Sequence, residues 1–213
     1  MFQVSTSLFL VWLSSLAFVA CEDPSTPSIN LDIGVDEEMI SSSDGAIDID
    51  VSTPEEIEST CQSNRRPLVL IHGFLGAGDT WNRQISRLIE TGTCRRYVKA
   101  FDWNSLDMSG EQSPLLDAII DELIAQSDYD QVDLVGHSAG GGVAYTYLEN
   151  INYAAKVHRY VHIASFPNDM PAGSQGEVPT LNLWSTDDLV VEGAEIPNAE
   201  NIRLSGFDHY SIA

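Results

Sequence analysis

The feature that most constrains the fold of this chain is a regular alternation between short apolar runs and longer helical segments, which begins near Arg65. The apolar runs are continuous, as expected for strands that are buried on both faces of a parallel sheet. The expected strands cover residues 67–72, 97–101, 131–135, 157–163, 179–184 and 201–204. The expected helices cover residues 81–90, 114–126 and 138–150. This order predicts an α/β fold, a mostly parallel sheet with helices on both faces, and leaves no insertion long enough for a separate lid domain.

Negative charge is concentrated ahead of these elements. The chain has 213 residues and a formal net charge of −22, and the stretch from Glu22 to Thr60 holds twelve acidic residues and no Lys or Arg. Such a composition does not favour a packed core, so we expect residues 22–60 to be an acidic disordered linker and residues 61–213 to be the folded domain. The charge is the opposite of a nucleic-acid binder's basic footprint and disfavours anionic headgroups. An uncharged ligand would meet no such repulsion.

Residues 1–21 resemble an export signal. The apolar run from Leu8 to Ala20 ends in small residues and is shorter than the roughly 20 apolar residues that a membrane span needs. A buried N-terminal helix is the alternative, although an acidic stretch follows directly. Cys21 closes the run in a context that resembles a bacterial lipobox. Two outcomes stay open for an exported protein: lipidation of Cys21, which would tether the chain to the cell envelope, or plain cleavage and secretion.

The two remaining cysteines, Cys61 and Cys94, both precede expected strands and could lie at the same edge of the sheet. An exported protein meets an oxidising compartment, in which paired cysteines tend to form disulfides. We therefore predict a Cys61–Cys94 disulfide, and two free buried thiols are the alternative.

The run Gly136-His137-Ser138-Ala139-Gly140 stands between an expected strand and an expected helix. A chance match to Gly-x-Ser-x-Gly is common, but this context makes it a strong sign of a nucleophile elbow. The turn strains the serine backbone, and glycines two residues on either side avoid collisions with neighbouring elements. The side chain is then raised at the start of a helix, where amides and the helix dipole favour negative charge. A glycine-rich helix start without chemistry is the alternative.

Four segments carry a resemblance to a known family. They are Leu70-Ile71-His72-Gly73-Phe74, Asp133–Gly141, Trp184–Val190 and Gly206-Phe207-Asp208-His209. From about Arg65 onward, and with its motifs in the family's order, the chain resembles the small lidless bacterial triacylglycerol lipases and esterases of the α/β-hydrolase superfamily. The resemblance implies hydrolysis of small-molecule or lipid esters of fatty acids by a monomer that uses no metal or organic cofactor.

A serine needs a base that takes its proton, and the superfamily's order is serine, acid, histidine. His209 follows the last expected strand and is the expected base, whereas the other four histidines are expected to have structural or surface roles. For the acid, Asp187 and Asp188 are both candidates. The family's acid commonly precedes one variable and two aliphatic residues, which favours Asp187. Asp169 is an outside candidate, and a solvated turn is the alternative for the pair.

The tetrahedral intermediate needs N–H donors for its oxyanion. The amide of Ala139, directly after the nucleophile, should be one donor, and the family's His-Gly-x motif implies the amide of Phe74 as the second. A phosphate-binding loop is a rival interpretation of residues 73–80, but the lysine that it requires is absent. The chain ends four residues after His209, where family members usually continue into a helix. We therefore expect exposed apolar surface and a loosely held His209 loop.

These residues predict a serine hydrolase that cleaves carboxylic esters through Ser138, Asp187 and His209 by way of an acyl-enzyme. An acyltransferase or a thioesterase with the same triad is the nearest alternative. A catalytically silent hydrolase-like binding module is the alternative from a different class.

Overall fold

Six parallel strands form the centre of the molecule. The computed structural model describes residues 61, 64–107 and 112–213. Its strands are β1 (Leu68–Ile71), β2 (Val98–Phe101), β3 (Val132–His137), β4 (Val157–Ile163), β5 (Thr180–Ser185) and β6 (Glu200–Leu204). They form one sheet in the order β2-β1-β3-β4-β5-β6, and every neighbouring pair is parallel. The predicted α/β fold with a parallel sheet is confirmed.

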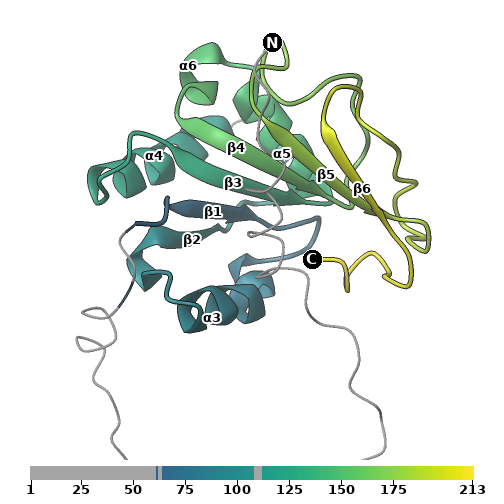
Figure 1. Ribbon diagram of the computed structural model, residues 1–213, viewed down its shortest axis with the longest axis horizontal. Coiled ribbons are helices and arrows are strands. Elements are labelled where there is room, and N and C mark those ends of the chain that lie inside the picture. The colour runs from purple at the N-terminus through teal and green to yellow at the C-terminus, as the bar shows by residue number, and fades with distance from the viewer. Residues whose placement is uncertain (1–60, 62–63, 108–111) are drawn as a thin grey trace, which may run out of the picture.

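Helices cover both faces of this sheet (Figure 1). One face carries α4 (Gln112–Ala125), α5 (Ala139–Leu148) and the short α6 (Ile151–Ala154). The other face carries the 3-10 turn η1 (Gly78–Trp81) and α3 (Asn82–Glu90), and a second 3-10 turn, η2 (Arg95–Tyr97), leads into β2. The expected helix over residues 138–150 is present as α5, and α6 begins just beyond it, where the side chain of Asn150 accepts a hydrogen bond from the amide of Asn152.

Alternate side chains of the strands fill two separate cores. Val69 and Ile71 of β1 pack with α4 and α5, whereas Leu68 and Leu70 pack with Trp81 and α3. All four β1 residues are buried, which explains the continuous apolar run in the sequence. Alternate side chains of a strand pack into different cores, so a shift of one residue would exchange them between the two faces. Packing on both faces therefore fixes the register of the sheet.

A disulfide joins Cys61 to Cys94, as predicted, with an S–S distance of 2.03 Å and a Cα–Cα distance of 4.9 Å. It fastens the chain ahead of β1 to the segment that leads into β2. The expected signal peptide of residues 1–21, lipidation of Cys21 and the acidic linker of residues 22–60 lie outside the described residues. Within the described part of the chain, no helix has the length and apolar character needed to cross a bilayer.

All loops that follow the strands gather at one edge of the sheet, because the six strands run in the same direction. In Figure 1 this is the right-hand edge, where the end of the chain also lies. Ligands of open α/β sheets bind outside the carboxyl ends of the strands. The candidate catalytic residues from the sequence, Ser138, Asp187, Asp188 and His209, follow β3, β5 and β6 and are found at this edge.

Candidate active site

Ser138 lies in a sharp turn between the end of β3 and the start of α5. Its backbone has φ 54° and ψ −127°, a region that non-glycine residues rarely adopt. A Cβ atom at Gly136 would lie 2.8 Å from the carbonyl oxygen of Gly140, and one at Gly140 would lie 2.5 Å from that of His72. The two glycines therefore allow the close approach that raises the Ser138 side chain above the sheet.

Two hydrogen bonds, one to the last residue of β4 and one from the loop that follows β4, brace this turn. The amide of Ser138 donates to the carbonyl oxygen of Ile163 at 3.0 Å, and the Ser165 hydroxyl donates to the carbonyl oxygen of Ser138 at 2.7 Å. A Cβ atom at Gly141 would lie 2.7 Å from Cβ of Ser165, so the third glycine makes room for this contact. Sequence reasoning missed Ser165, because nothing local distinguishes it from other polar residues after β4.

His209 connects the serine to a carboxylate. Its Nε2 atom lies 2.8 Å from Oγ of Ser138, and its Nδ1 atom lies 2.7 Å from Oδ2 of Asp188. The side chains of His209 and Asp188 are almost completely buried. The carboxylate can only accept from Nδ1, which leaves the neutral ring free to accept the Ser138 proton at Nε2.

The acid partner of His209 is Asp188, and the preference for Asp187 was wrong. The Asp187 carboxylate accepts a hydrogen bond from the amide of Gly206 at 2.6 Å, so it holds the loop after β6 instead. Asp188 accepts from the amides of Val190 and Val191 at 2.8 and 3.0 Å. Side chains of consecutive residues point in different directions, and the turn after β5 directs only the second one toward His209.

The environment of Asp188 keeps it ionised. Burial alone would raise its pKa, but hydrogen bonds from the amides of Val191 and Val190 and from the His209 ring together lower the pKa below its usual value.

Asp169, the outside candidate for the acid, is exposed in the loop after β4. Both ring nitrogens of His209 already have partners, so neither faces Asp169.

His137 contacts the backbone of His209, which the sequence did not reveal. Its Nε2 atom donates to the carbonyl oxygen of His209 at 2.8 Å, and the two rings lie 5.0 Å apart. The other side of the His137 ring meets Trp81 edge-on, with the ring centroids 6.4 Å apart. Burial lowers the pKa of His137 to about 4, so the ring is neutral near pH 7. His137 thus links the loop after β6 to the core beneath α3.

The remaining histidines have other partners. His72 is buried, stacks on Trp103 and donates through Nδ1 to the carbonyl oxygen of Gly73 at 2.8 Å. His162 donates to the carbonyl oxygen of Phe166, and burial lowers its pKa to about 4. His158 lies 3.3 Å from Asp133 near the start of β4.

The loop after β1 runs directly beside the serine. A Cβ atom at Gly73 would lie 2.9 Å from Cβ of Ser138 and 3.4 Å from its Oγ. The amide of Gly76 donates back to the carbonyl oxygen of Gly73, and that of Leu75 donates to the Ser105 hydroxyl. Leu75 itself has a positive φ of 56°. These contacts fold the Gly73–Gly76 turn tightly against the elbow.

The end of the chain is held more firmly than we expected. Ile212 and Ala213 are partly buried against the core on the α3 side, and the carbonyl oxygen of Ala213 accepts from Nε2 of Gln84 at 2.6 Å. The Asp208 carboxylate accepts from the amides of Tyr210 and Ser211. Together with the bond from His137, these contacts fix the loop that presents His209.

A cavity of about 210 Å³ borders the elbow. The amide of Ala139 is the first N–H of α5 and has no acceptor within the helix. At Gly142, three residues further on, an added Cβ would meet nothing within 4 Å, so the cavity is open above this residue. Its lining consists of Trp103, Asp107, Gln112, Ser113, Ala139, Gly142, Val143 and Thr146.

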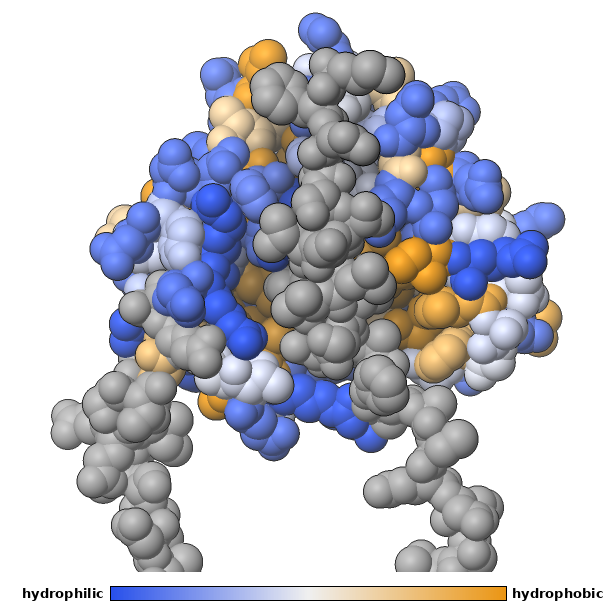
Figure 2. Space-filling view, viewed as in Figure 1, coloured by the Kyte–Doolittle hydropathy of each residue, from blue (hydrophilic) through white to orange (hydrophobic). Residues whose placement is uncertain are grey.

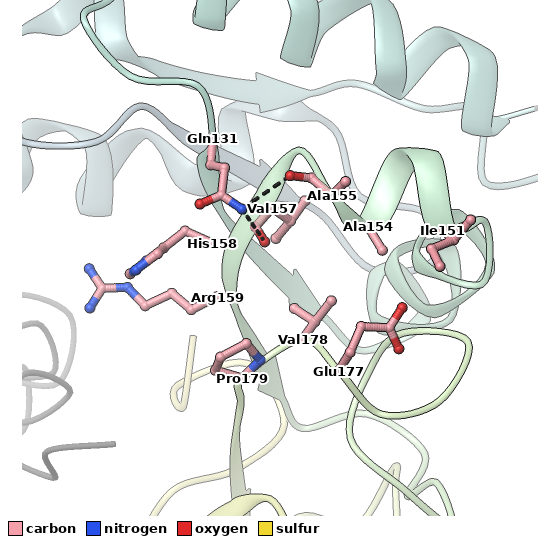
Figure 3. A pocket seen from close by; sticks show the side chains of 10 residues that line it. All are labelled: Gln131, Ile151, Ala154, Ala155, Val157, His158, Arg159, Glu177, Val178 and Pro179. Carbon is pink, nitrogen blue, oxygen red and sulfur yellow. Dashed lines mark hydrogen bonds between the residues drawn. The ribbon is translucent and has the colours of Figure 1, made fainter. Parts of the chain in front are cut away.

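A larger cavity, of about 500 Å³, lies away from this site (Figure 3). It is lined by residues of α6, the first residues of β4 and residues 177–179. Gln131, just ahead of β3, donates to the carbonyl oxygens of Ala155 and Val157 at its wall. These residues mark the amino ends of β3 and β4, at the edge of the sheet opposite to Ser138.

Two successive hydrogen bonds connect the Ser138 hydroxyl to the His209 imidazole and the imidazole to the Asp188 carboxylate, at the start of α5. Such a line of hydrogen bonds can transfer the serine proton to the imidazole as the oxygen attacks an electrophile. Among the described residues, no group of three or more His, Cys, Asp or Glu side chains is arranged to hold a metal ion.

A family model described as the alpha/beta hydrolase fold matches residues 66–179 of the chain. A protein of Synechocystis sp., provisionally named a non-heme chloroperoxidase, is 32% identical over 118 residues. That match covers 51% of this chain and 42% of the relative, so the chain spans less than half of the relative's length.

Solved structures share the architecture at low identity. A mature lipase from Bacillus licheniformis has a TM-score of 0.55 and 16% identity, over 71% of this chain and 88% of that one. An esterase from Rhodococcus sp. ECU1013 has a TM-score of 0.51 and 16% identity, over 70% of this chain and 86% of that one. At such identities the likeness concerns the fold.

Proposed function

The chain belongs to the alpha/beta hydrolase fold family, and from that premise we propose that it is a serine hydrolase that cleaves carboxylic esters. The observation that carries the proposal is the line of hydrogen bonds from Ser138 through His209 to Asp188. The strained backbone of Ser138 adds to it, because such strain persists where the surrounding structure enforces it and clusters at active sites.

In the proposed reaction, Oγ of Ser138 attacks the ester carbonyl while Nε2 of His209 takes its proton. The imidazolium is stabilised by Asp188, and it returns the proton to the leaving alcohol as the carbon–oxygen bond breaks. Water then gives a proton to His209 and attacks the acyl-enzyme. The carboxylic acid leaves, and the Ser138 hydroxyl is restored.

The oxyanion of each tetrahedral intermediate is assigned to the amides of Ala139 and Phe74. Ala139 offers the first free N–H of α5, on the positive end of the helix dipole. Phe74 follows Gly73, whose contact with Ser138 brings this loop beside the nucleophile. The cavity of about 210 Å³ next to Ala139 is then suited to the acyl group.

The proposal of a carboxylic ester as substrate draws support from similar proteins and from charge. Two structures of the same architecture are named as a lipase and an esterase. The net charge of −22 disfavours anionic substrates such as phosphate esters and leaves uncharged esters unaffected.

Export of the protein from the cytoplasm is a further proposal. The Cys61–Cys94 disulfide supports it, because such bonds persist mainly in oxidising compartments. Cell fractionation that finds the chain in the cytosol with reduced thiols would refute export.

The decisive variant is Ser138→Ala. We expect the hydrolysis of p-nitrophenyl esters of two to eight acyl carbons to fall by about 10³-fold or more, and labelling by a fluorophosphonate probe to disappear. Ser127→Ala is the matched control, because this serine lies in the turn after α4, where it contacts the carbonyl oxygen of Ile124. Full turnover in the Ser138 variant would refute the proposal.

Further assays separate the alternatives. An acyltransferase would give a new ester when an alcohol is added, and a thioesterase would favour thioesters. A silent binding module would not react with the fluorophosphonate. The name of the Synechocystis relative adds a fourth assay, halide oxidation with hydrogen peroxide.

A further inference from the structure

The peptide group that joins Ser138 to Ala139 takes part in two sets of contacts. Its N–H belongs to Ala139 and is the first free amide of α5, which the proposed reaction assigns to the oxyanion. Its carbonyl belongs to Ser138, and it accepts from the amide of Gly141 at 2.9 Å and from the hydroxyl of Ser165 at 2.7 Å. Any group that holds this carbonyl therefore also acts on the oxyanion donor.

The two ends of this peptide group cannot turn independently. A peptide bond is planar, and in its trans form the C=O and the N–H point in opposite directions. None of the peptide bonds among the described residues is cis. A rotation that moves the carbonyl oxygen of Ser138 therefore turns the N–H of Ala139 by the same angle. Hydrogen bonds weaken steeply as their angle departs from linearity, so such a rotation would weaken the bond to an oxyanion.

The turn after β4 holds Ser165 on both of its sides. Ala164 has a positive φ of 42°, a conformation rare for residues other than glycine, and its amide donates to the carbonyl oxygen of Leu183 at 2.9 Å. Beyond Ser165, Nε2 of His162 donates to the carbonyl oxygen of Phe166 at 3.0 Å. Ser165 itself is only 4% exposed. Its hydroxyl is thus presented to the elbow by a turn that is fixed at both ends.

We propose that Ser165 is a positioning residue that keeps the N–H of Ala139 directed at the oxyanion; this rests on the proposed function. The Ser138 backbone, with φ 54° and ψ −127°, is strained, and such strain persists only where the surroundings enforce it. The amide of Gly141 belongs to α5 and would move with it, whereas Ser165 belongs to another element and opposes rotation of the peptide. Its bond to the carbonyl also polarises the peptide group and strengthens the N–H as a donor.

A purely structural role for the Ser165 hydroxyl is the alternative, and kinetics separate the two roles. A bond that orients an oxyanion donor acts mainly in the transition state, so its loss lowers kcat and leaves KM nearly unchanged. A bond that only stabilises the fold changes the amount of folded protein and leaves the kcat of each folded molecule unchanged. Kinetic constants are therefore counted per serine that reacts with a fluorophosphonate.

The test compares Ser165→Ala with Thr180→Val in the full chain. Thr180 is the matched control, because it is also 4% exposed and its hydroxyl also donates to a backbone carbonyl, that of Val178, at 2.9 Å. It lies at the start of β5, at the edge of the sheet opposite to Ser138. Both substitutions thus remove a buried hydroxyl, but only one of these hydroxyls contacts the elbow.

Two ligands report on the oxyanion. The substrate is p-nitrophenyl butyrate, an uncharged ester, because hydrophobic residues are exposed toward the right of Figure 2, the side on which the strands end in Figure 1. The second ligand is a trifluoromethyl ketone, which mimics the tetrahedral intermediate. Oγ of Ser138 bonds to its carbonyl carbon, the serine proton passes to Nε2 of His209, and the ketone oxygen becomes the oxyanion. Thermal unfolding of each variant reports its stability.

We expect Ser165→Ala to lower kcat about 10- to 100-fold, less than the loss of a complete oxyanion donor, and to change KM by less than about threefold. Affinity for the trifluoromethyl ketone should fall by a similar factor. Thr180→Val should lower the melting temperature and keep kcat within about twofold of the wild type. An unchanged kcat in Ser165→Ala, a loss confined to KM, or equal losses of kcat in the two variants overturns the proposal.

If Ser165→Ala does not fold, Ser165→Cys takes its place. A thiol is a weaker donor than a hydroxyl, so kcat should fall several-fold at an unchanged KM, and a wild-type kcat overturns the proposal.

The wild-type chain separates this proposal from the proposed function. If it reacts with the fluorophosphonate and hydrolyses the ester while Ser165→Ala has the same kcat, only the role of Ser165 is rejected. If it neither reacts nor hydrolyses the ester, the serine hydrolase itself is rejected, and the role of Ser165 with it.

Discussion

Two adjacent aspartates follow β5, and their carboxylates face different parts of the protein. Asp188 meets the imidazole of His209 and two backbone amides, and it is buried. Asp187 is exposed and receives the amide of Gly206. At the scale of single residues, the chemistry of the site thus depends on which of the two carboxylates the turn after β5 directs toward His209.

Replacing each aspartate by asparagine separates these roles. Asp188→Asn should lower kcat on a nitrophenyl ester by about 10³–10⁴-fold, because the amide no longer stabilises the imidazolium and favours the wrong tautomer of His209. Asp187→Asn should change kcat by less than about 10-fold, because its side-chain oxygen can still accept from Gly206. Steady-state kinetics of the two purified variants provide the measurement. A larger loss in the Asp187 variant would restore Asp187 as the acid.

The elbow shows how one element depends on close approach between backbones. Gly140 and Gly142 lie in the first turn of α5, two residues apart. A Cβ atom at Gly140 would lie 2.5 Å from the carbonyl oxygens of both Ile71 and His72, which are backbone atoms that cannot move aside easily. A Cβ atom at Gly142 meets nothing within 4 Å. The same substitution should therefore have opposite effects at the two positions.

Gly140→Ala should displace α5 from β1, lower the melting temperature and abolish fluorophosphonate labelling. Gly142→Ala should keep labelling and stabilise the protein by up to about 1 kcal/mol, because alanine favours the helix. Thermal unfolding and labelling rates are measured on both variants. Wild-type behaviour of the Gly140 variant would contradict the packing of the elbow described above.

Elements that depend on local patterns could be predicted from the sequence, whereas contacts between distant segments could not. The strands follow from continuous apolar runs, and Ser138 follows from glycines at fixed spacing around a strand end. The bond from His137 to the carbonyl oxygen of His209 joins residues 72 positions apart, and that from Ser165 to Ser138 joins residues 27 apart. Such contacts depend on how loops are placed around the sheet, as does the direction of Asp188.

For the molecule as a whole, acid stability is set by buried histidines. Burial lowers the pKa values of His137 and His162 from the ordinary histidine value of 6.5 to about 4. The unfolded chain therefore binds protons first as the pH falls, and stability is lost between pH 6.5 and about 4, by up to about 3 kcal/mol for each histidine. Asp188 has a lowered pKa, so its stabilising contribution is lost only at still lower pH.

The variant His137→Gln tests two points: the loss of stability at acid pH that is due to His137, and the role of the hydrogen bond from His137 to the carbonyl oxygen of His209. Glutamine can still donate to the carbonyl oxygen of His209 but does not titrate, so unfolding takes up one proton fewer. The slope of unfolding free energy against pH should fall by about 1.4 kcal/mol per pH unit in the middle of the window. Urea unfolding from pH 4.5 to 6.5 with the disulfide intact gives the slope. The variant His137→Met has no N–H group to donate to the carbonyl oxygen of His209 and also does not titrate. It should reduce the slope of unfolding free energy against pH as much as the glutamine variant does, but its kcat should fall further. An unchanged slope in both variants would show that His137 is already protonated in the folded protein across this range, or that it stays neutral in both states.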